Sequence, residues 1–374
     1  MRLLKLLAAA GALAIAMPAF AAPTYTLTDI GDLPGGANSS IAYGINNLGQ
    51  VVGQSAGTAG TRAFVWTDGV MTALPTLPNA PQFGTSARGI NDQGQIVGNG
   101  VGFTTLGQAV NRGIVWQNGV ATSIGDLPGG SDYSQAYAIN NSGQVAGISY
   151  GVTGQSAVMW QNGTMTSLGD LPGGTAASVA QAINDNGQVA GQGTSAAGGM
   201  AAVFADGQAT DLGDLPGGST ASYGRGINDA GHVVGNSSIS SAVHAFVWIN
   251  GVMTDLGEIA GGANQSVAYD INNAGRVVGI GYDVTGAQAV MWFDSEIFSL
   301  ASLVSNIGGW RLTTAFAVND RGQIVGQGVS NGATRAFLLT PDTFDNSDVP
   351  EPAALGLFGL GFAGLALRRR RRKG

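Results

Sequence analysis

The feature that most constrains the fold is an internal repeat of about 44 residues. Each copy opens on a Leu-Pro pair or its counterpart, and the intervals between copies are 44 residues except for one of 50. The seven openings are at Leu33, Leu77, Leu127, Leu171, Leu215, Ile259 and Leu303. A period of this length is typical of propeller blades and solenoid repeats, so the whole body of the chain must be explained by one unit.

Each copy contains four short β-rich runs. In the first copy we expect strands at residues 41–46, 50–54, 63–67 and 70–74. The hairpin at Asn46-Asn47-Leu48-Gly49 supplies Asn and Gly, which tolerate the left-handed conformations that a tight turn needs. The third and fourth strands are joined by Asx-Gly turns at Asp68-Gly69, Asn118-Gly119, Asn162-Gly163, Asp206-Gly207 and Asn250-Gly251, with Asp294-Ser295 as the exception. Asx-Gly between β runs predicts a hairpin, and four such strands make a propeller blade.

The two ends of the repeat complement each other. The seventh copy stops after its third strand, at residues 336–339, and residues 25–31 resemble a fourth strand that lacks its own blade. We expect the N-terminal strand to complete the last blade, because a closed ring leaves no unprotected sheet edge. A solenoid is the alternative, but it would require two different polar caps. The predicted fold is an all-β, seven-bladed propeller of four-stranded blades over residues 22–341, followed by a linker at 342–348.

The first 21 residues have the pattern of a secretory signal peptide. Arg2 and Lys5 precede an apolar run at residues 6–17, and Ala19-Phe20-Ala21 fits a cleavage site before Ala22. A buried N-terminal helix is the alternative, and it would have little helical structure to pack on. We therefore expect export.

The C-terminus has three ordered parts at residues 349–374. A stiff tetrapeptide at 349–352 precedes an uncharged run at 353–367, and six consecutive cations occupy 368–373. Such a cluster stays on the cytoplasmic side of a membrane. The apolar run is short for a transmembrane helix, so we expect transient membrane anchoring.

Two known families resemble parts of this chain. Pro350, Glu351 and Pro352, with the apolar run and the Arg cluster, resemble a PEP-CTERM sorting signal. That resemblance implies an exosortase-type sorting protease as partner, a Gram-negative bacterium, often one that makes exopolysaccharide, and a cell-surface or extracellular-matrix location. The body resembles the extracellular HAF-repeat proteins through His244-Ala245-Phe246 and the shorter Ala63-Phe64 and Ala336-Phe337. This second resemblance implies secretion but brings no established chemistry.

Composition of the mature chain limits its partners. Setting aside the signal peptide and the tail leaves 8 basic and 22 acidic residues, a net charge of about −14, and no Lys. Nucleic acid is not an expected partner, because phosphate binding needs a positive surface. The chain has no Cys, so no disulfide supports the fold.

A search for catalytic motifs yields none that we accept. Ser55 and Ser149 each lie in a Gly-x-Ser-x-Gly pattern, but that nucleophile motif requires a following helix, and two sister copies read Gly-Asn-Gly-Val-Gly and Gly-Gln-Gly-Thr-Ser there. His232 and His244 read as structural residues. We predict no catalytic residues and no enzyme activity.

One ring of acidic residues recurs in the loops between blades. Its members are Asp32, Asp126, Asp170, Asp214 and Glu258. These carboxylates could hold Ca²⁺, the one cofactor that the sequence suggests, since Ca²⁺ takes oxygen ligands. The alternative is that each side chain caps its own Pro-Gly turn.

A second ring occupies equivalent positions on the inner strands, three residues before the repeated Asn. Its members are Tyr43, Arg88, Tyr137, Gln181, Arg225 and Tyr269, with Phe316 in the seventh copy. The copies agree at scaffold positions but differ here. We predict that these side chains line the axial mouth and bind a neutral or acidic saccharide. The alternative is packing between blades, on the same strand face as Ile45.

Three functions follow from these features. The first is a non-enzymatic surface or biofilm-matrix protein that serves as a structural or interaction module, together with exopolysaccharide. The second is a lectin-like or calcium-dependent carbohydrate-binding module. The third is an extracellular polysaccharide lyase or hydrolase, which would need a pair of inward carboxylates. Asp270 is the acid that breaks the small-residue pattern on the inner strands.

Overall fold

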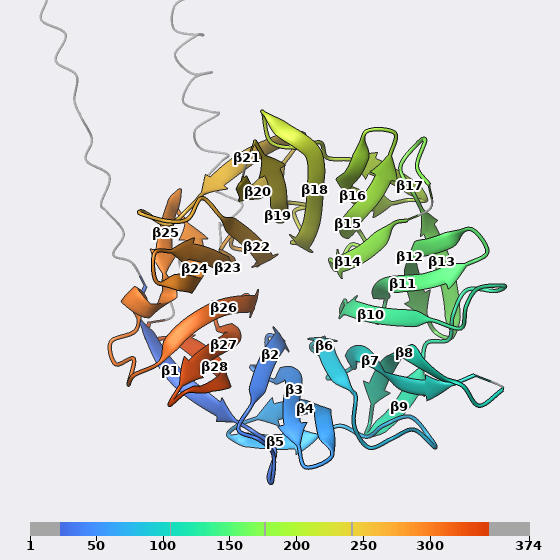
Figure 1. Cartoon of the computed structure of the whole chain (residues 1–374), viewed down its shortest axis with the longest axis horizontal. Coiled ribbons are helices and arrows are strands. Elements are labelled where there is room, and N and C mark those ends of the chain that lie inside the picture. The colour runs from blue at the N-terminus through green and yellow to red at the C-terminus, as the bar shows by residue number, and fades with distance from the viewer. Residues whose placement is uncertain (1–22, 105, 176, 241, 344–374) are drawn as a thin grey trace, which may run out of the picture.

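The predicted seven-bladed propeller is confirmed. The computed structural model describes residues 23–343 apart from 105, 176 and 241, so the predicted signal peptide and sorting tail lie outside the described residues. Seven four-stranded antiparallel sheets surround a central axis (Figure 1). The described residues contain one short 3₁₀ helix, η1 (Leu300–Leu303), and no helix long and apolar enough to cross a membrane.

Each blade runs from an inner strand at the axis to an outer strand at the rim. The inner strands are β2 (Ser40–Ile45), β6 (Ser86–Ile90), β10 (Ser134–Ile139), β14 (Val179–Ile183), β18 (Gly218–Ile227), β22 (Ser266–Ile271) and β26 (Arg311–Val318). The second strands are β3 (Val51–Gly57), β7 (Ile96–Phe103), β11 (Val145–Gly151), β15 (Val189–Ser195), β19 (Val233–Ile239), β23 (Val277–Asp283) and β27 (Ile324–Ser330). The third strands are β4 (Gly60–Thr67), β8 (Ala109–Gln117), β12 (Gly154–Gln161), β16 (Gly198–Ala205), β20 (Ala242–Ile249), β24 (Gly286–Phe293) and β28 (Ala333–Pro341).

The outer strands are shorter than the second strands in six of the seven blades. They are β5 (Val70–Ala73), β9 (Val120–Ser123), β13 (Thr164–Gly169), β17 (Gln208–Asp211), β21 (Val252–Gly257) and β25 (Glu296–Ser299), and the seventh is the N-terminal β1 (Tyr25–Gly31). We number the blades 1 to 7 from the one that contains β2 to the one that contains β26. Blade 7 has the strand order β1-β28-β27-β26, so it joins the two ends of the described chain, blue and red in Figure 1.

The Asx-Gly turns have the backbone that the sequence predicts. Asp68 and Gly69 have φ of 47° and 87°, the left-handed pair that a two-residue hairpin requires, and the equivalent turns match. The exception at Asp294-Ser295 adopts the same conformation with φ of 51° and 65°. A serine there bears the strain that glycine avoids elsewhere.

The repeated Asn of the other hairpin has a different role from the one we expected. Gly49 has a φ of 81°, but Asn46 does not have a positive φ. Its side-chain oxygen accepts the N–H groups of Leu48 and Gln50 at 3.1 and 2.9 Å, and its Nδ2 donates to the carbonyl oxygen of Asn91 in the next blade at 3.0 Å. The residue is therefore selected for hydrogen bonds between blades and not for a left-handed backbone.

This contact repeats in every blade and closes on itself. The Nδ2-to-carbonyl distances lie between 2.9 and 3.2 Å around the circle Asn46, Asn91, Asn140, Asn184, Asn228, Asn272, Asn319 and back to Asn46. All seven side chains are buried, with 3–5% of their surface exposed. A buried amide that donates to the next blade and accepts from its own hairpin fixes the distance between neighbouring inner strands.

A second set of contacts joins blades farther from the axis. Ser40 accepts the N–H of Ala336 and donates to the carbonyl of Gly31, both in blade 7. Equivalent hydroxyls at Ser134, Ser178, Ser222 and Ser266 make the same two contacts with the preceding blade. Each blade joint thus has a hydrogen bond at the axis and, in most cases, a hydroxyl bridge behind it.

Small residues on the inner strands let the blades approach closely, as the sequence predicts. A Cβ added to Gly44 would lie 2.9 Å from the Arg88 carbonyl oxygen, and one added to Gly226 would lie 2.9 Å from the Asp270 Cα. Real Cβ atoms do not reach this separation, so glycine is required by the approach of the neighbouring strand.

The asparagine circle should carry a measurable part of the stability. Asn184→Ala removes the donor to the Asn228 carbonyl and the acceptor of the Gln188 N–H, so two buried groups lose their partners. We expect a loss of roughly 2–4 kcal/mol in the free energy of unfolding, measured by urea titration. Asn186→Ala in the same hairpin removes an exposed contact to Asp229, and it should cost less than about 1 kcal/mol. Equal losses in the two variants would contradict the role assigned to the circle.

Candidate functional site

The predicted axial ring coincides with a β-bulge in every inner strand. In blade 1 the pairing register shifts between Ala42 and Gly44, so Tyr43 is the extra residue. The same shift surrounds Arg88, Tyr137, Gln181, Arg225, Tyr269 and Phe316 in the other blades. A bulge redirects the side chain of its extra residue. Strict alternation along a flat strand would have placed these side chains with Ile45 between the blades.

A glycine of the second strand accommodates each bulge. A Cβ added to Gly53 would lie 1.9 Å from the carbonyl oxygen of Ile41, and the six equivalent glycines show 1.9–2.0 Å. They are Gly98, Gly147, Gly191, Gly235, Gly279 and Gly326. A glycine inside a strand is a sequence signal for a bulge, and this signal could have identified the orientation of the ring from sequence alone.

The bulge residues line one cavity on the axis, with a volume of about 490 Å³. All six predicted ring residues and Phe316 belong to its wall, and Asn99 and Gln135 add two more polar side chains. The structure therefore brings the whole predicted ring together, although its role in binding remains a prediction.

One half of the cavity wall is a continuous aromatic arc that ends in an arginine on each side. The Phe316 ring lies 5.2 Å from the Tyr43 ring and 5.3 Å from the Tyr269 ring. The Arg88 guanidinium lies 4.2 Å from the Tyr43 ring centre, and the Arg225 guanidinium lies 5.3 Å from that of Tyr269. We call these five side chains the aromatic arc. Such contacts hold flat rings in fixed orientations toward the cavity.

The other half of the wall is polar. The Tyr137 hydroxyl donates to Gln135 on the same strand, and the Tyr223 hydroxyl donates to Gln181 Oε1 at 3.1 Å. Arg225 Nε donates to Asn236 Oδ1 at 2.7 Å, so this arginine is held at its base. The cavity thus places stacking surfaces opposite hydrogen-bonding groups.

The phenols of the cavity remain protonated at neutral pH. Burial raises the pKa of Tyr43 and of Tyr269, although Arg88 and Arg225, respectively, partly oppose this. Burial also raises the pKa of Tyr137, and that of Tyr223 to about 12. These groups therefore serve as hydrogen-bond donors and flat surfaces, and not as bases.

Asp270 is the only carboxylate in the cavity wall. Its two oxygens accept the N–H groups of Ile271 and Val318, each at 2.9 Å, so it bridges blades 6 and 7. Burial raises the pKa of Asp270 to about 7, despite these two hydrogen bonds. The carboxyl is half protonated near neutral pH, and its hydrogen bonds help to join the inner strands of these two blades.

A shallower hollow of about 170 Å³ lies at the other end of the axis. Ile45 and its equivalents line this hollow, and three of them also line the axial cavity, so an apolar ring separates the two spaces. Its rim is a second closed circle, in which each residue after the repeated Asn donates its N–H to the side chain of the next blade at 2.8–2.9 Å. These carboxylates and amides are committed to each other, and we assign them a structural role.

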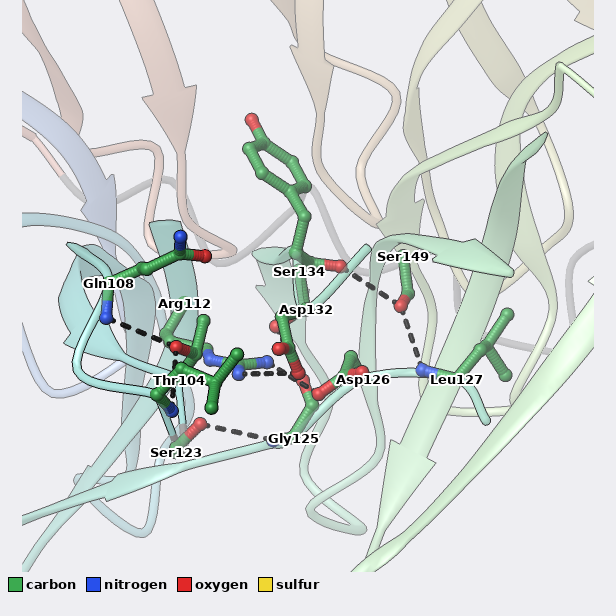
Figure 2. Close-up of polar contacts among 12 residues, drawn as sticks. Thr104, Gln108, Arg112, Ser123, Gly125, Asp126, Leu127, Asp132, Ser134 and Ser149 are labelled. Atoms are coloured by element: carbon green, nitrogen blue, oxygen red, sulfur yellow. Dashed lines mark hydrogen bonds and ion pairs between the residues drawn. The ribbon is translucent and has the colours of Figure 1, made fainter. Parts of the chain in front are cut away.

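The predicted acidic ring is not gathered into one site. Asp32 accepts a hydrogen bond from Arg335 Nη1 at 2.8 Å, and Asp126 pairs with Arg112, which also contacts Asp132 at 3.1 Å (Figure 2). Both arginines occupy the position of the His in the His-Ala-Phe motif. His244 itself lies 2.8 Å from Asp255 through Nδ1 and 3.1 Å from Asn264 through Nε2. Burial alone would lower the pKa of His244, but these hydrogen bonds outweigh it and raise that pKa.

Asp170 behaves as the capping alternative expected. Its carboxylate accepts N–H groups from Leu171, Ala177 and Thr194 and the hydroxyl of Thr194. Burial alone would raise the pKa of Asp170, but the hydroxyl bond and the three N–H bonds outweigh it and lower that pKa. Within the described part of the chain, no group of three or more His, Cys, Asp or Glu side chains could hold a metal ion. The calcium hypothesis gains no support from the arrangement of the five acids.

The two serines of the Gly-x-Ser-x-Gly pattern are buried strand residues. Ser55 Oγ accepts the N–H of Leu33, and Ser149 Oγ accepts that of Leu127 (Figure 2), so each hydroxyl fixes the loop that enters its blade. Both are fully buried. Neither lies at a strand-to-helix turn, as a nucleophile of that motif would.

Comparison with known proteins identifies the tail. Residues 348–372 match the PEP-CTERM protein-sorting motif, which confirms the predicted sorting signal and indicates an exported protein. No curated protein sequence matches the chain.

Solved structures with a similar backbone share little sequence with this chain. The structure described as YCF48 bound to D1 peptide has 12% identity, a TM-score of 0.49, and coverage of 87% of this chain and 99% of that one. The β-propeller domain of the Trilobed protease from Pyrococcus furiosus has 10% identity, a TM-score of 0.48, and coverage of 69% and 82%. The fold assignment rests on the sheets of this chain, and these similarities assign no function.

The glycine opposite each bulge can be tested by a pair of variants in strand β23. Gly279→Ala would place a Cβ 2.0 Å from the Val267 carbonyl oxygen, so the bulge that presents Tyr269 must shift. We expect a loss of about 3 kcal/mol or more in the free energy of unfolding. Gly281→Ala, two residues later, meets a side-chain atom of Val290 at 3.3 Å and should cost less than about 1.5 kcal/mol. Similar urea midpoints for the two variants would contradict this role of the glycine.

Asp270 should give the stability a pH dependence of defined sign. Its pKa is about 7 in the folded protein and about 4 when unfolded, so the folded state binds more protons between these values. The stability that protonation of Asp270 contributes is complete below pH 4 and is lost as the pH rises to 7. We expect the unfolding free energy of wild type relative to Asp270→Ala to fall by about 1 kcal/mol per pH unit across that window and to level off above it. Parallel stability curves for the two proteins would show that Asp270 does not titrate there.

Proposed function

We propose that this chain is an exported, non-enzymatic interaction module that binds a saccharide in its axial cavity. The observation that carries the proposal is the set of seven bulges, each of which directs a variable side chain into one cavity. A ring that served only for packing would need neither the bulges nor the polar groups. Aromatic faces on one wall and hydrogen-bonding groups on the other suit a sugar, which has an apolar face and a hydroxyl-rich edge.

Two features of the cavity support a role without catalysis. A glycosidase of the usual kind uses two carboxylates that flank the bond to be cleaved, and the cavity wall contains only Asp270. The raised pKa values of the phenols make them poor general bases near neutral pH. Binding and retention of the saccharide is the simpler use of this site.

The sorting motif supports a location where such binding is useful. We place the mature propeller at the cell surface or in the extracellular matrix of a Gram-negative bacterium, after recognition of the tail by an exosortase-type protease. A rigid ring that holds exopolysaccharide would serve as an interaction module of that matrix.

A glycan array tests the proposal. The full chain, purified in mild detergent, is applied with and without Ca²⁺, beside the variant Tyr43→Ala/Tyr137→Ala/Tyr269→Ala. We expect calcium-independent binding that the triple variant weakens by about tenfold or more. Tyr150→Ala, which alters a tyrosine that is 36% exposed and does not belong to the cavity wall, is the control and should bind as wild type does.

Three results would contradict the proposal. Binding that the folded triple variant retains would place the ligand elsewhere on the molecule. Absence of any glycan signal would favour a purely structural matrix role, and a strict requirement for Ca²⁺ would favour the calcium-dependent alternative.

A further inference from the structure

The two arginines of the aromatic arc lack acidic partners. Among the described residues, neither Arg88 nor Arg225 lies within ion-pair distance of a carboxylate, although the chain as a whole is strongly acidic. By contrast, Arg112 and Arg335 are both paired with aspartates in the loops between blades. Arg88 and Arg225 differ from the other arginines in lining one cavity, where two cations without a carboxylate at ion-pair distance can be matched by an anion supplied from outside.

The two arginines are held to different degrees. Arg225 Nε is bonded to Asn236, and its guanidinium lies between the rings of Tyr223 and Tyr269, at 4.8 and 5.3 Å from their centres. Arg88 stacks on Tyr43, but its Nε is buried and has no hydrogen-bond partner. An unsatisfied buried polar group is costly, and because Arg88 lines the cavity, a ligand there can add hydrogen bonds to its guanidinium.

We infer that the axial cavity recognises a negatively charged saccharide, whose ring lies on the aromatic arc and whose carboxylate is bound by Arg88. A guanidinium presents a planar fork that fits the two oxygens of a carboxylate. This inference rests on the proposed function and specifies its ligand class, a uronic acid or a polymer of such acids.

The charge balance of the cavity agrees with this assignment. The wall contributes two permanent positive charges and one carboxyl, Asp270, whose oxygens are already occupied by two backbone N–H groups. The site is therefore positive at any pH near neutrality, within a chain of net charge −7. A neutral sugar would use the stacking surfaces but would leave both guanidinium groups uncompensated.

The direct test compares one ligand in two charge states. The full chain in mild detergent is titrated calorimetrically with an oligogalacturonate and with the same oligomer as its methyl ester, which has no charge. We expect the acid form to bind at least about tenfold more tightly, as is typical of hydrogen bonds to a charged partner. This comparison uses the wild-type protein alone and does not depend on how a variant folds.

Two variants test whether Arg88 is the residue that binds the carboxylate. Arg88→Gln should weaken binding of the acid by about tenfold or more and remove most of the preference for the acid over the ester. Arg321→Gln removes the same charge from an exposed hairpin at the other end of the axis, and it should change neither ligand.

The outcomes separate this inference from the proposed function. Equal binding of acid and ester, with loss of both in the triple tyrosine variant, would keep a saccharide site in the cavity and overturn the acidic assignment. An acid preference that Arg88→Gln leaves intact would also overturn it. Binding of neither oligomer would overturn the inference, and the glycan array would then decide the proposed function on its own.

Discussion

The structure depends on a closed circle of hydrogen bonds in which seven asparagine amides each reach the backbone carbonyl of the next blade. Because the side chain is short, the circle fixes how far apart neighbouring inner strands can lie. That spacing leaves no room for a Cβ at Gly44 or Gly226, and it explains why those positions are held by very small residues. The asparagine also organises its own hairpin, so one side chain sets both the local turn and the ring.

The bulge separates the scaffold from the site within a single strand. Residues on either side of it serve the asparagine circle or the hydroxyl bridge, and they keep the same chemistry in nearly every blade. The bulged residue takes no part in either set of contacts, because the facing glycine, such as Gly53, leaves room for the bulge that turns its side chain away from the strand. A chain built from one repeat can therefore vary seven positions independently and still close its ring.

Much of this could be predicted from the sequence, and the exceptions have physical reasons. The repeat and the Asx-Gly turns are local patterns, so blade number and hairpins followed from them. The members of the axial ring were found because they vary where neighbours agree, but their direction stayed open between the axial mouth and the blade joints, since alternation along a strand assumes that no residue is inserted. The hydrogen bond between Asp32 and Arg335 could not be predicted from the sequence either. The two residues lie 303 positions apart, and closure of the ring brings them together.

The wall of the cavity is asymmetric, whereas the scaffold around it repeats seven times. The three rings of the aromatic arc lie on blades 6, 7 and 1, so Tyr43 and Phe316 touch across the joint between blades 1 and 7. That joint is held by the Asn319-to-Asn46 bond at the axis and by the Ser40 bridge to blade 7 behind it. The stacking surface thus exists only in the closed ring, whereas Tyr137 and Gln181 lie on consecutive blades well inside the chain. A ligand that covers the arc would contact residues of both β26 and β2, and by linkage it would stabilise the closed propeller, whose ring is completed by the noncovalent pairing of β1 with β28.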